Sequence, residues 1–147
     1  GMAGRASAQA ADLRCDHDWP PYDQLAVCVA THRDGDVAAR VAVRFQELLE
    51  SLRLIRALCT GLPKGATCAP IGLPPREAIG AGWVEGWRGE VFVALELRPD
   101  GRIRRCHAHD PSWQNWPVLE HAVIGNIVPD FPLINKSFNL SYSGHDL

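Results

Sequence analysis

The residues from Asp36 to Cys59, DVAARVAVRFQELLESLRLIRALC, carry the clearest structural pattern in the chain. Apolar side chains recur there every three or four residues, which places them on one stripe of a helix. The stripe comprises Val37, Val41, Phe45, Leu48, Leu52, Ile55 and Cys59. Asp34 or Asp36 can cap the start, and Gly61 with Pro63 ends the helix. The spacing therefore predicts a long amphipathic helix of roughly 35 Å.

Charged side chains occupy the opposite side of this predicted helix: Arg40, Arg44, Glu47, Glu50, Arg53 and Arg56. A helix of this length needs several neighbours to cover its apolar stripe, and the rest of the sequence predicts only one other helix. We therefore expect part of the stripe to pack against something outside this chain. Because exposed apolar surface seeks cover, we also expect the isolated chain to self-associate.

The segments before and after the long helix are less regular. Residues 1–22 predict an irregular leader, because small residues dominate its start and Trp19–Tyr22, WPPY, cannot continue a helix. Gln24–Thr31, QLAVCVAT, is apolar or small on both faces and predicts a buried strand. Residues 61–82 hold nine Gly or Pro and predict a long loop, of a kind that is usually functional or packed against a partner.

The second half of the chain predicts a small antiparallel sheet. Trp83–Arg88 and Glu90–Arg98 are strand-like, and the turn PDG at 99–101 leads into a returning strand. Pairing Leu97 with Ile103 would place Glu96 opposite Arg104.

A short helix, Trp116–Gly125, follows with Asn115 as its cap, and then an extended tail, Asn126–Leu147. The fold class is therefore α+β: one long amphipathic helix, a small antiparallel sheet with a hairpin, one short helix and an extended C-terminal tail.

Composition narrows the class of protein. With 147 residues, 46% hydrophobic and 22% charged, the chain fits one globular domain and excludes a disordered polymer. Its net charge of −2 argues against a nucleic-acid-binding protein, which needs a clustered positive surface. No apolar run approaches the ~18–20 residues that cross a bilayer. The five cysteines contain no CxxC pair, which favours free thiols, buried or half-buried, in a reducing compartment.

Two histidines are candidate metal ligands. His107 and His109 would share a face of the returning strand, near Val93 and Val91, where they could hold a metal with a third ligand or cover the edge of the core. Cys106 would point to the opposite face, which argues against a Cys–His nucleophile.

Several arginines and tryptophans are candidates for contacts with a partner or a ligand. Four arginines, Arg98, Arg102, Arg104 and Arg105, crowd the hairpin tip, as a docking patch for an acidic partner or as a solvated end. Four tryptophans, Trp83, Trp87, Trp113 and Trp116, cover the core or form an interface. Arg88, beside a glycine at the mouth of the sheet, can meet an anion.

Several motifs occur together in one order. They are GDVAAR (35–40), ESLRLI (50–55), GWRGE (86–90), DPSWQNWP (110–117) and GNIVPDFPLI (125–134). With them the chain, from about Asp12 to Leu147, resembles the C-terminal portion of the large subunit of energy-converting nickel–iron hydrogenases of the hydrogenase-3 type. It is equally similar to the homologous D-type subunit of NADH:quinone oxidoreductase, complex I.

The resemblance implies a cavity without its metal. In the hydrogenases two CxxC pairs hold nickel and iron, and the second pair falls where this chain has Ser141 and Gly144. The serine hydroxyl and the glycine, which has no side chain, cannot replace thiolate ligands. The resemblance therefore implies no nickel–iron centre and no metal in this chain. The implied cavity-lining candidates are Arg88, Asp130, Ser141, Gly144 and His145. The structural alternative is that Arg88 bridges carboxylates and pins the tail.

The resemblance also implies a role and partners. Residues 23–147 would be the C-terminal domain of a longer redox subunit, on the cytoplasmic side of the inner membrane. That subunit would pass electrons from an iron–sulfur cluster on a small partner subunit to a quinone-like acceptor. The implied partners are the N-terminal part of its own subunit, the iron–sulfur subunit and membrane subunits. The isolated chain would be inactive. The alternative is a non-catalytic module that docks the subunits of such a complex.

Overall fold

The computed structural model describes residues 1–17 and 19–146. The elements are α1 (Met2–Ala6), α2 (Leu13–Asp16), η1 (Tyr22–Gln24), α3 (Val37–Gly61), β1 (Ala78–Glu85), β2 (Glu90–Leu97), β3 (Ile103–His109), α4 (Ser112–Ala122), η2 (Val128–Asp130), α5 (Phe131–Phe138) and η3 (Ser143–His145). The three strands form one antiparallel sheet in the order β1-β2-β3. The α+β fold class is confirmed.

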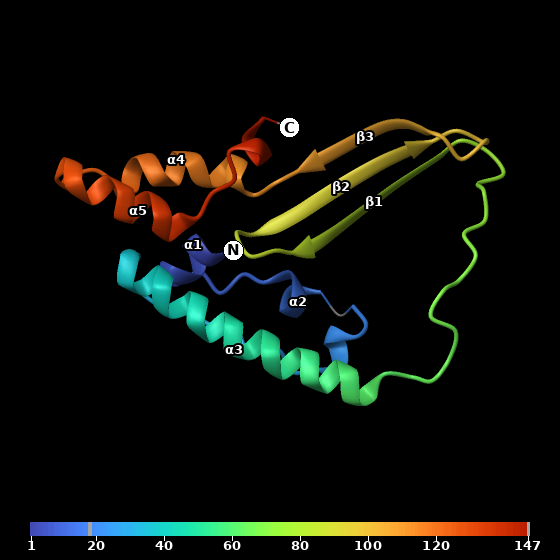
Figure 1. The fold of residues 1–147 in the computed structure, drawn as a ribbon, viewed down its shortest axis with the longest axis horizontal. Coiled ribbons are helices and arrows are strands. Elements are labelled where there is room, and N and C mark those ends of the chain that lie inside the picture. Colours follow the sequence, from blue (N-terminus) through green and yellow to red (C-terminus); the bar gives the residue numbers. More distant parts are fainter. Residues whose placement is uncertain (18, 147) are drawn as a thin grey trace.

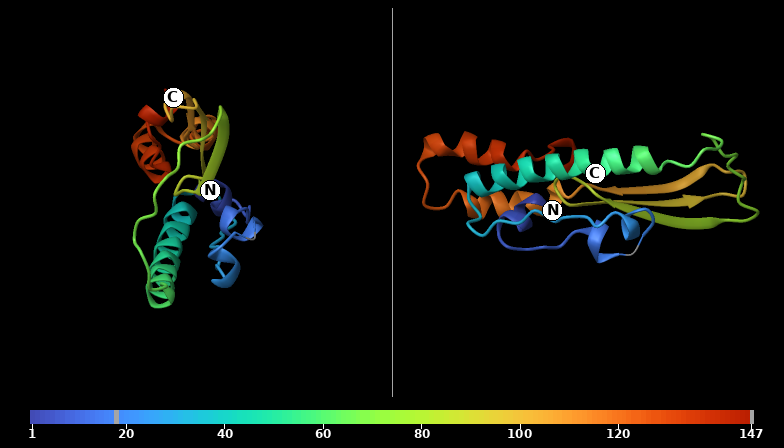
Figure 2. Two further views of the ribbon diagram at one scale, coloured as in Figure 1. Left: turned by 90° about the vertical axis from the view of Figure 1, so that its right-hand side faces the viewer. Right: turned by 90° about the horizontal axis from the view of Figure 1, so that it is seen from below.

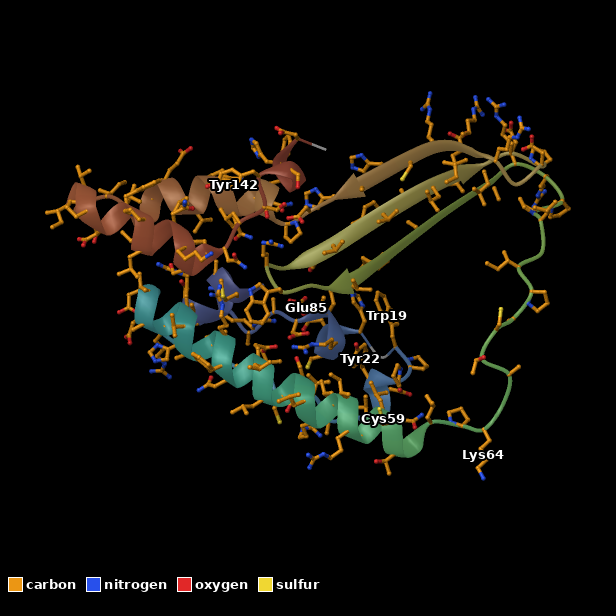
Figure 3. All side chains as sticks on the ribbon, viewed as in Figure 1. Trp19, Tyr22, Cys59, Lys64, Glu85 and Tyr142 are labelled. Carbon is orange, nitrogen blue, oxygen red and sulfur yellow. The ribbon has the colours of Figure 1, made fainter. Side chains whose placement is uncertain are left out.

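The long helix and the sheet diverge from a common end of the molecule. Figure 1 shows α1, α4 and α5 gathered at that end, with α3 and the strands extending away from it. The loop of residues 62–77 crosses from the far end of α3 to the far end of β1, as the two views of Figure 2 also show. Trp19, Tyr22 and Glu85 lie between the sheet and α3 (Figure 3).

Helix α3 is present as predicted, but its burial is the reverse of the ordinary pattern. The Asp36 carboxylate caps it by accepting from the Ala39 N–H at 2.7 Å. The buried residues are Ala39, Arg40, Val43, Glu47, Glu50 and Leu54, whereas Phe45 and Leu52 of the apolar stripe are 62% and 55% exposed. The chain therefore covers the side of α3 that carries these polar and apolar residues, and it leaves most of the apolar stripe exposed.

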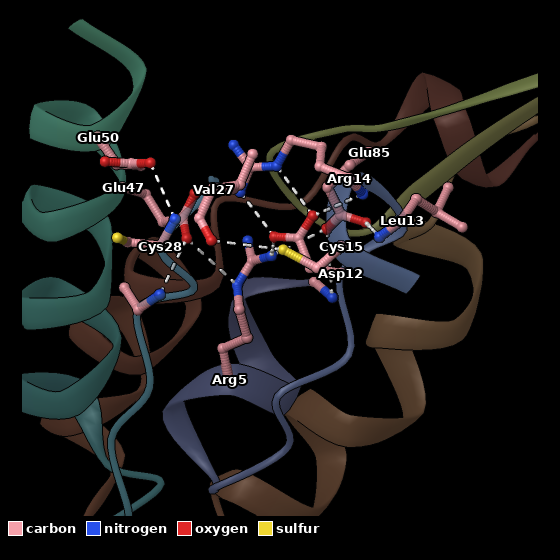
Figure 4. A network of polar contacts seen from close by, with 12 residues as sticks. Arg5, Asp12, Leu13, Arg14, Cys15, Val27, Cys28, Glu47, Glu50 and Glu85 are labelled. Atoms are coloured by element: carbon pink, nitrogen blue, oxygen red, sulfur yellow. Dashed lines mark hydrogen bonds and ion pairs between the residues drawn. The ribbon is translucent and has the colours of Figure 1, made fainter. Parts of the chain in front are cut away.

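A buried ion cluster explains which side is covered (Figure 4). It consists of Arg5, Asp12, Arg14, Glu47 and Glu85. Arg5 Nη1 lies 2.8 Å from Asp12 Oδ2 and 3.0 Å from Glu85 Oε1. Arg14 Nη2 lies 2.6 Å from Asp12 Oδ2 and 2.9 Å from Glu47 Oε2. The N-terminal segment, α3 and β1 thus meet through charge pairs. Removing any one partner would leave a buried charge without its counter-ion.

Two predictions for the N-terminal part were wrong. Residues 1–22 are not an irregular leader, because α1 and α2 form there and Met2 and Ala6 enter a small core with Ala39 and Val43. No strand forms over Gln24–Thr31. The Cys28 N–H instead donates to Glu50 Oε1 at 2.9 Å and the Ala30 N–H to Glu47 Oε1 at 3.4 Å. Carboxylates of α3 take the place of a partner strand.

The sheet differs from the prediction in length and in register. β1 begins at Ala78, inside the stretch predicted as loop, and ends at Glu85. Leu97 pairs with Ile103 as predicted, but a bulge makes Glu96 pair with Arg105 rather than Arg104. Arg104 Nη1 still reaches Glu96 Oε1 at 2.9 Å.

The bulge also moves the histidines. Beyond it His107 lies opposite Ala94 and His109 opposite Phe92, not beside Val93 and Val91. The two rings therefore belong to the opposite face of the sheet from the one predicted.

The C-terminal segment is helical where an extended tail was predicted. α4 begins at Ser112 instead of Trp116, because Asp110 Oδ1 accepts the Ser112 N–H at 2.7 Å and starts the helix early. α5 then packs Ile134 and Phe138 against Leu119.

The five cysteines are free, and all are exposed rather than buried. Among residues 1–17 and 19–146 no helix is long and apolar enough to cross a membrane.

The surface of the chain is large for its mass. It exposes 10,424 Å², whereas a folded monomer of 16.1 kDa exposes about 7,400 Å². The excess lies on the α3 stripe and on the sheet, where Val84 is 62% and Ile79 is 83% exposed.

Removal of one cation tests the ion cluster. Replacing Arg5 by Met should lower the free energy of unfolding by about 3 kcal/mol, because Asp12 and Glu85 lose a shared donor while staying buried. Urea unfolding measures this, with Arg33→Met as the exposed control. Equal effects of the two substitutions would contradict the cluster's role.

The contact between Glu50 and Arg53 predicts a pH dependence. Hydrogen bonds from Arg53 lower the pKa of Glu50 from 4.5 to about 2. A carboxylate with a depressed pKa stabilises the fold above its unfolded pKa, so this contribution is complete above pH 4.5 and disappears as the pH falls towards 2. Glu50→Gln should flatten that part of the stability curve in urea unfolding at stepped pH, and the exposed-site variant Glu120→Gln should not.

Candidate functional site at the C-terminal turn

The turn of residues 141–144 is held by its own hydroxyl groups. The Gly144 N–H donates to Ser141 Oγ at 3.0 Å, and Ser141 Oγ lies 3.2 Å from Ser143 Oγ. The Ser141 N–H donates to Ser112 Oγ at 3.0 Å, which ties the turn to the first residue of α4. Ser141 therefore acts as an internal acceptor that closes the turn.

Gly144 packs directly against Asp110. A Cβ at position 144 would lie 2.7 Å from Asp110 Cγ and 2.8 Å from its Cβ, closer than side chains approach one another. Burial by itself raises the pKa of Asp110. Hydrogen bonding by Ser112 and the charge of Arg88 outweigh it, and the pKa lies below its ordinary value. An ionised carboxylate fills the space where a side chain at 144 would stand.

Arg88 connects the sheet to the C-terminal segment. It lies in the turn between β1 and β2, and its Nε donates to the Asn139 carbonyl at 2.6 Å. Asn115 Nδ2 donates back to the Arg88 carbonyl at 3.1 Å. Arg88 thus holds the segment after α5 through a carbonyl, and not through bridged carboxylates as the structural alternative predicted.

A groove of about 300 Å³ opens beside Arg88. Its side-chain lining includes Arg88, Glu90, Phe92, His109, Gln114 and Asn115. His109 Nε2 lies 3.0 Å from Gln114 Oε1, which fixes the orientation of the ring. The groove therefore combines a guanidinium, a carboxylate, an oriented imidazole and an aromatic face.

The predicted site residues are only partly brought together. Ser141, Gly144 and His145 lie on one turn next to α4, where the His145 ring is 5.1 Å from the Trp113 ring. Arg88 reaches this region through Asn139. Asp130 does not join them, because it precedes α5 at the opposite end of that helix from Phe138.

Sequence reasoning missed two contributors to this region. Asp110 and Asn115 both belong to the motif DPSWQNWP, which identified the resemblance, but neither was assigned a position in the cavity. His109 was considered as a metal ligand, as cover for the edge of the core and as a base for Cys106, but not as part of this groove. Within the described ranges, no cluster of three or more His, Cys, Asp or Glu could hold a metal ion.

Comparisons with known proteins agree on one group. Residues 1–80 match the family described as respiratory-chain NADH dehydrogenase, 49 Kd subunit. The chain is 34% identical to the carbon monoxide-induced hydrogenase of Rhodospirillum rubrum, over 95% of this chain and 38% of that protein. It is 39% identical to the C/D-type subunit of NADH-quinone oxidoreductase from Phocaeicola vulgatus, over 68% of this chain and 20% of that protein.

A solved structure has the same fold. The membrane-bound sulfane sulfur reductase, an archaeal respiratory membrane complex, contains a chain that matches with a TM-score of 0.83 and 26% identity. The match covers all of this chain and 42% of that one. The present chain thus spans well under half the length of the proteins that it resembles.

The contact between Gly144 and Asp110 can be tested by a double-mutant cycle. Gly144→Ala should lower the free energy of unfolding by about 1–3 kcal/mol, because the new methyl group overlaps the carboxylate. In the Asp110→Ala background the same change should cost less. Gly72→Ala, which meets nothing within 4 Å, is the control. Additive losses in thermal or urea unfolding would show that the two positions are not in contact.

Proposed function

The chain belongs to the 49 Kd subunit family of respiratory-chain NADH dehydrogenase, and from this membership we propose that it forms part of an electron-transfer subunit. In this proposal the subunit sits in a membrane-associated complex, receives electrons from an iron–sulfur cluster on a partner and delivers them to a quinone-like acceptor. The chain reaches the membrane through partner subunits and is inactive alone.

The excess surface is the observation that carries the assembly part of the proposal. About 3,000 Å² more than expected for this mass is exposed, which is the scale of an obligate interface. The stripe on α3 contributes Phe45, Leu48, Leu52 and Ile55, which are 48–62% exposed, and the adjacent Leu49 is 66% exposed. This stripe is covered by the N-terminal part of the same subunit, since the matched relatives are much longer than this chain. The iron–sulfur and membrane subunits cover further surface.

The groove beside Arg88 supports the acceptor part of the proposal. A quinone headgroup presents two carbonyl oxygens and a flat ring. The guanidinium of Arg88 is a donor for such oxygens, and Phe92 offers a face on which a ring can stack. The His109 ring, whose Nε2 is 3.0 Å from Gln114 Oε1, lines the same groove. Arg88 would also stabilise the negative charge that develops on a carbonyl oxygen during reduction.

We propose that this chain holds no nickel–iron centre. The hydrogenase-like site needs thiolates at positions 141 and 144, and the residues present do not fit. Ser141 Oγ is engaged by the Gly144 N–H, and Asp110 occupies the room that a side chain at 144 would need. A soft, low-valent metal requires thiolate ligands, which neither residue supplies.

The alternative proposal is a structural module that docks subunits without taking part in electron transfer. One observation favours it: Arg88 Nε is already bound to the Asn139 carbonyl, so the arginine has a structural task. The two proposals differ in whether the groove binds an acceptor.

Quinone titration separates them. A short-chain ubiquinone analogue should quench the tryptophan fluorescence of the chain saturably. Arg88→Met should weaken that binding about tenfold through loss of a charged hydrogen bond. Arg33→Met is the matched control and should bind as the parent does. Absence of saturable quenching, or equal affinity in Arg88→Met, would refute the acceptor role and leave the structural module.

The exposed stripe predicts the behaviour of the isolated chain. It should self-associate, and Leu52→Glu should shift it towards the monomer because a charge is then placed on the buried face of the oligomer. Sedimentation velocity at several concentrations measures this, with Ile124→Glu as an exposed control outside the stripe. A monomeric parent at high concentration would contradict the role given to the stripe.

A further inference from the structure

One edge of the molecule combines positive charge with protruding aliphatic side chains. This distal edge consists of residues 62–77, the loop after α3, and residues 96–105, the β2–β3 turn with its flanks. Figure 1 shows both segments at the end remote from α4 and α5, where the last part of the loop meets the β2–β3 turn and its first part lies near the end of α3. A Cβ on Gly101 would overlap Leu73, so the loop and the turn are in contact.

The charge of the distal edge is opposite to that of the rest of the chain. The edge carries six basic residues, Lys64, Arg76, Arg98, Arg102, Arg104 and Arg105, against three acidic ones, Glu77, Glu96 and Asp100. Its net charge is +3, although the whole chain is −2. The side chains of Arg102 and Arg105 are both 81% exposed, and Lys64 points away from the fold in Figure 3.

Aliphatic side chains stand singly among these charges. Ile71 is 96% exposed, and Leu62, Leu73 and Ile103 are 60–74% exposed. Along residues 62–77 and 96–105 they alternate with basic residues and prolines. Isolated aliphatic side chains between basic ones suit a surface that is anionic outside and apolar just beneath.

We propose that, in addition to its attachment through partner subunits, the distal edge binds directly to the anionic phospholipid surface of a membrane. The arginines and Lys64 contact phosphate groups, and Ile71 and Leu73 enter the boundary between headgroups and acyl chains. This contact is independent of the acceptor groove and of the subunit interfaces proposed above. An acidic protein surface would satisfy the charges alone and would not require the protruding aliphatic side chains.

Vesicle binding tests this proposal. The chain should cosediment with vesicles of phosphatidylglycerol and phosphatidylcholine more strongly than with pure phosphatidylcholine, and added salt should reduce the difference. Each basic residue removed should lower the affinity about fivefold, so Arg98→Gln with Arg105→Gln should lower it about 25-fold. The matched control is Arg33→Gln with Lys136→Gln, which removes the same charge outside the edge and should have a much smaller effect.

A second pair of variants tests the aliphatic contribution. Ile71→Ser should weaken binding to the anionic vesicles, whereas Ile124→Ser, exposed at 73% outside the edge, should not. Inorganic phosphate should compete no better than chloride at equal ionic strength, which distinguishes a lipid surface from a site for the free ion.

Three results would overturn the proposal: equal binding to anionic and neutral vesicles, equal loss in both charge pairs, or no effect of Ile71→Ser. If binding depended on charge but Ile71→Ser had no effect, the edge would bind through its charges alone, as expected for an acidic protein partner.

Discussion

The buried ion cluster around Glu47 determines which face of α3 this chain covers. Arg5 and Arg14 bring the N-terminal segment onto the polar side of the helix, and Glu85 brings the sheet to the same place. Further along, Arg40 Nε donates to Ser137 Oγ at 2.8 Å and its guanidinium lies over the Phe138 ring. Polar contacts thus hold three separate parts of the chain on one side of α3.

This arrangement leaves the apolar stripe for another surface. The two hydrophobic clusters of the chain are small, one around Val43 and one around Phe138. A chain of this length that stood alone would bury the stripe first, because burying apolar surface is the dominant favourable contribution to folding. The chain belongs to a family whose matched members are much longer than it is, and its charge pairs hold α3 with this stripe exposed.

The same packing accounts for the altered C-terminal turn. Ser141 closes the turn through its hydroxyl, and Asp110 fills the space next to Gly144. Arg88 keeps the segment after α5 in place by donating to the Asn139 carbonyl. Asn139 itself has a left-handed backbone conformation with φ 53°. These contacts give the turn a defined shape, and the groove of about 300 Å³ lies beside Arg88.

Much of the fold could be predicted where local pattern decides the outcome. The long run of regular spacing gave α3 with its Asp36 cap, and the PDG turn gave the hairpin. Elements that depend on distant partners could not be found in this way. α1 and α2 are too short to show a period. The segment before α3 has the apolar pattern of a strand, but its N–H groups donate to glutamates of α3 instead of to a partner strand.

Two further misses have particular causes. The bulge after Glu96 shifted both histidines by one position, and no residue type indicates such an irregularity. In the tail, Phe131, Ile134 and Phe138 follow helical spacing over only two turns, which the neighbouring prolines concealed. Of the site, Arg88, Ser141, Gly144 and His145 were identified from the resemblance. The filling of the space at 144 by Asp110 could be seen only in three dimensions.

Hydrogen–deuterium exchange along α3 tests the central claim most directly. The chain would be compared alone, at a concentration where it is monomeric, and co-expressed with the N-terminal part of a matched relative. Amides from Leu48 to Gly61 should exchange at least tenfold more slowly in the co-expressed form, because a covered stripe suppresses local opening. Identical exchange in the two forms, with the partner bound, would show that the stripe is not the surface through which this chain joins its subunit.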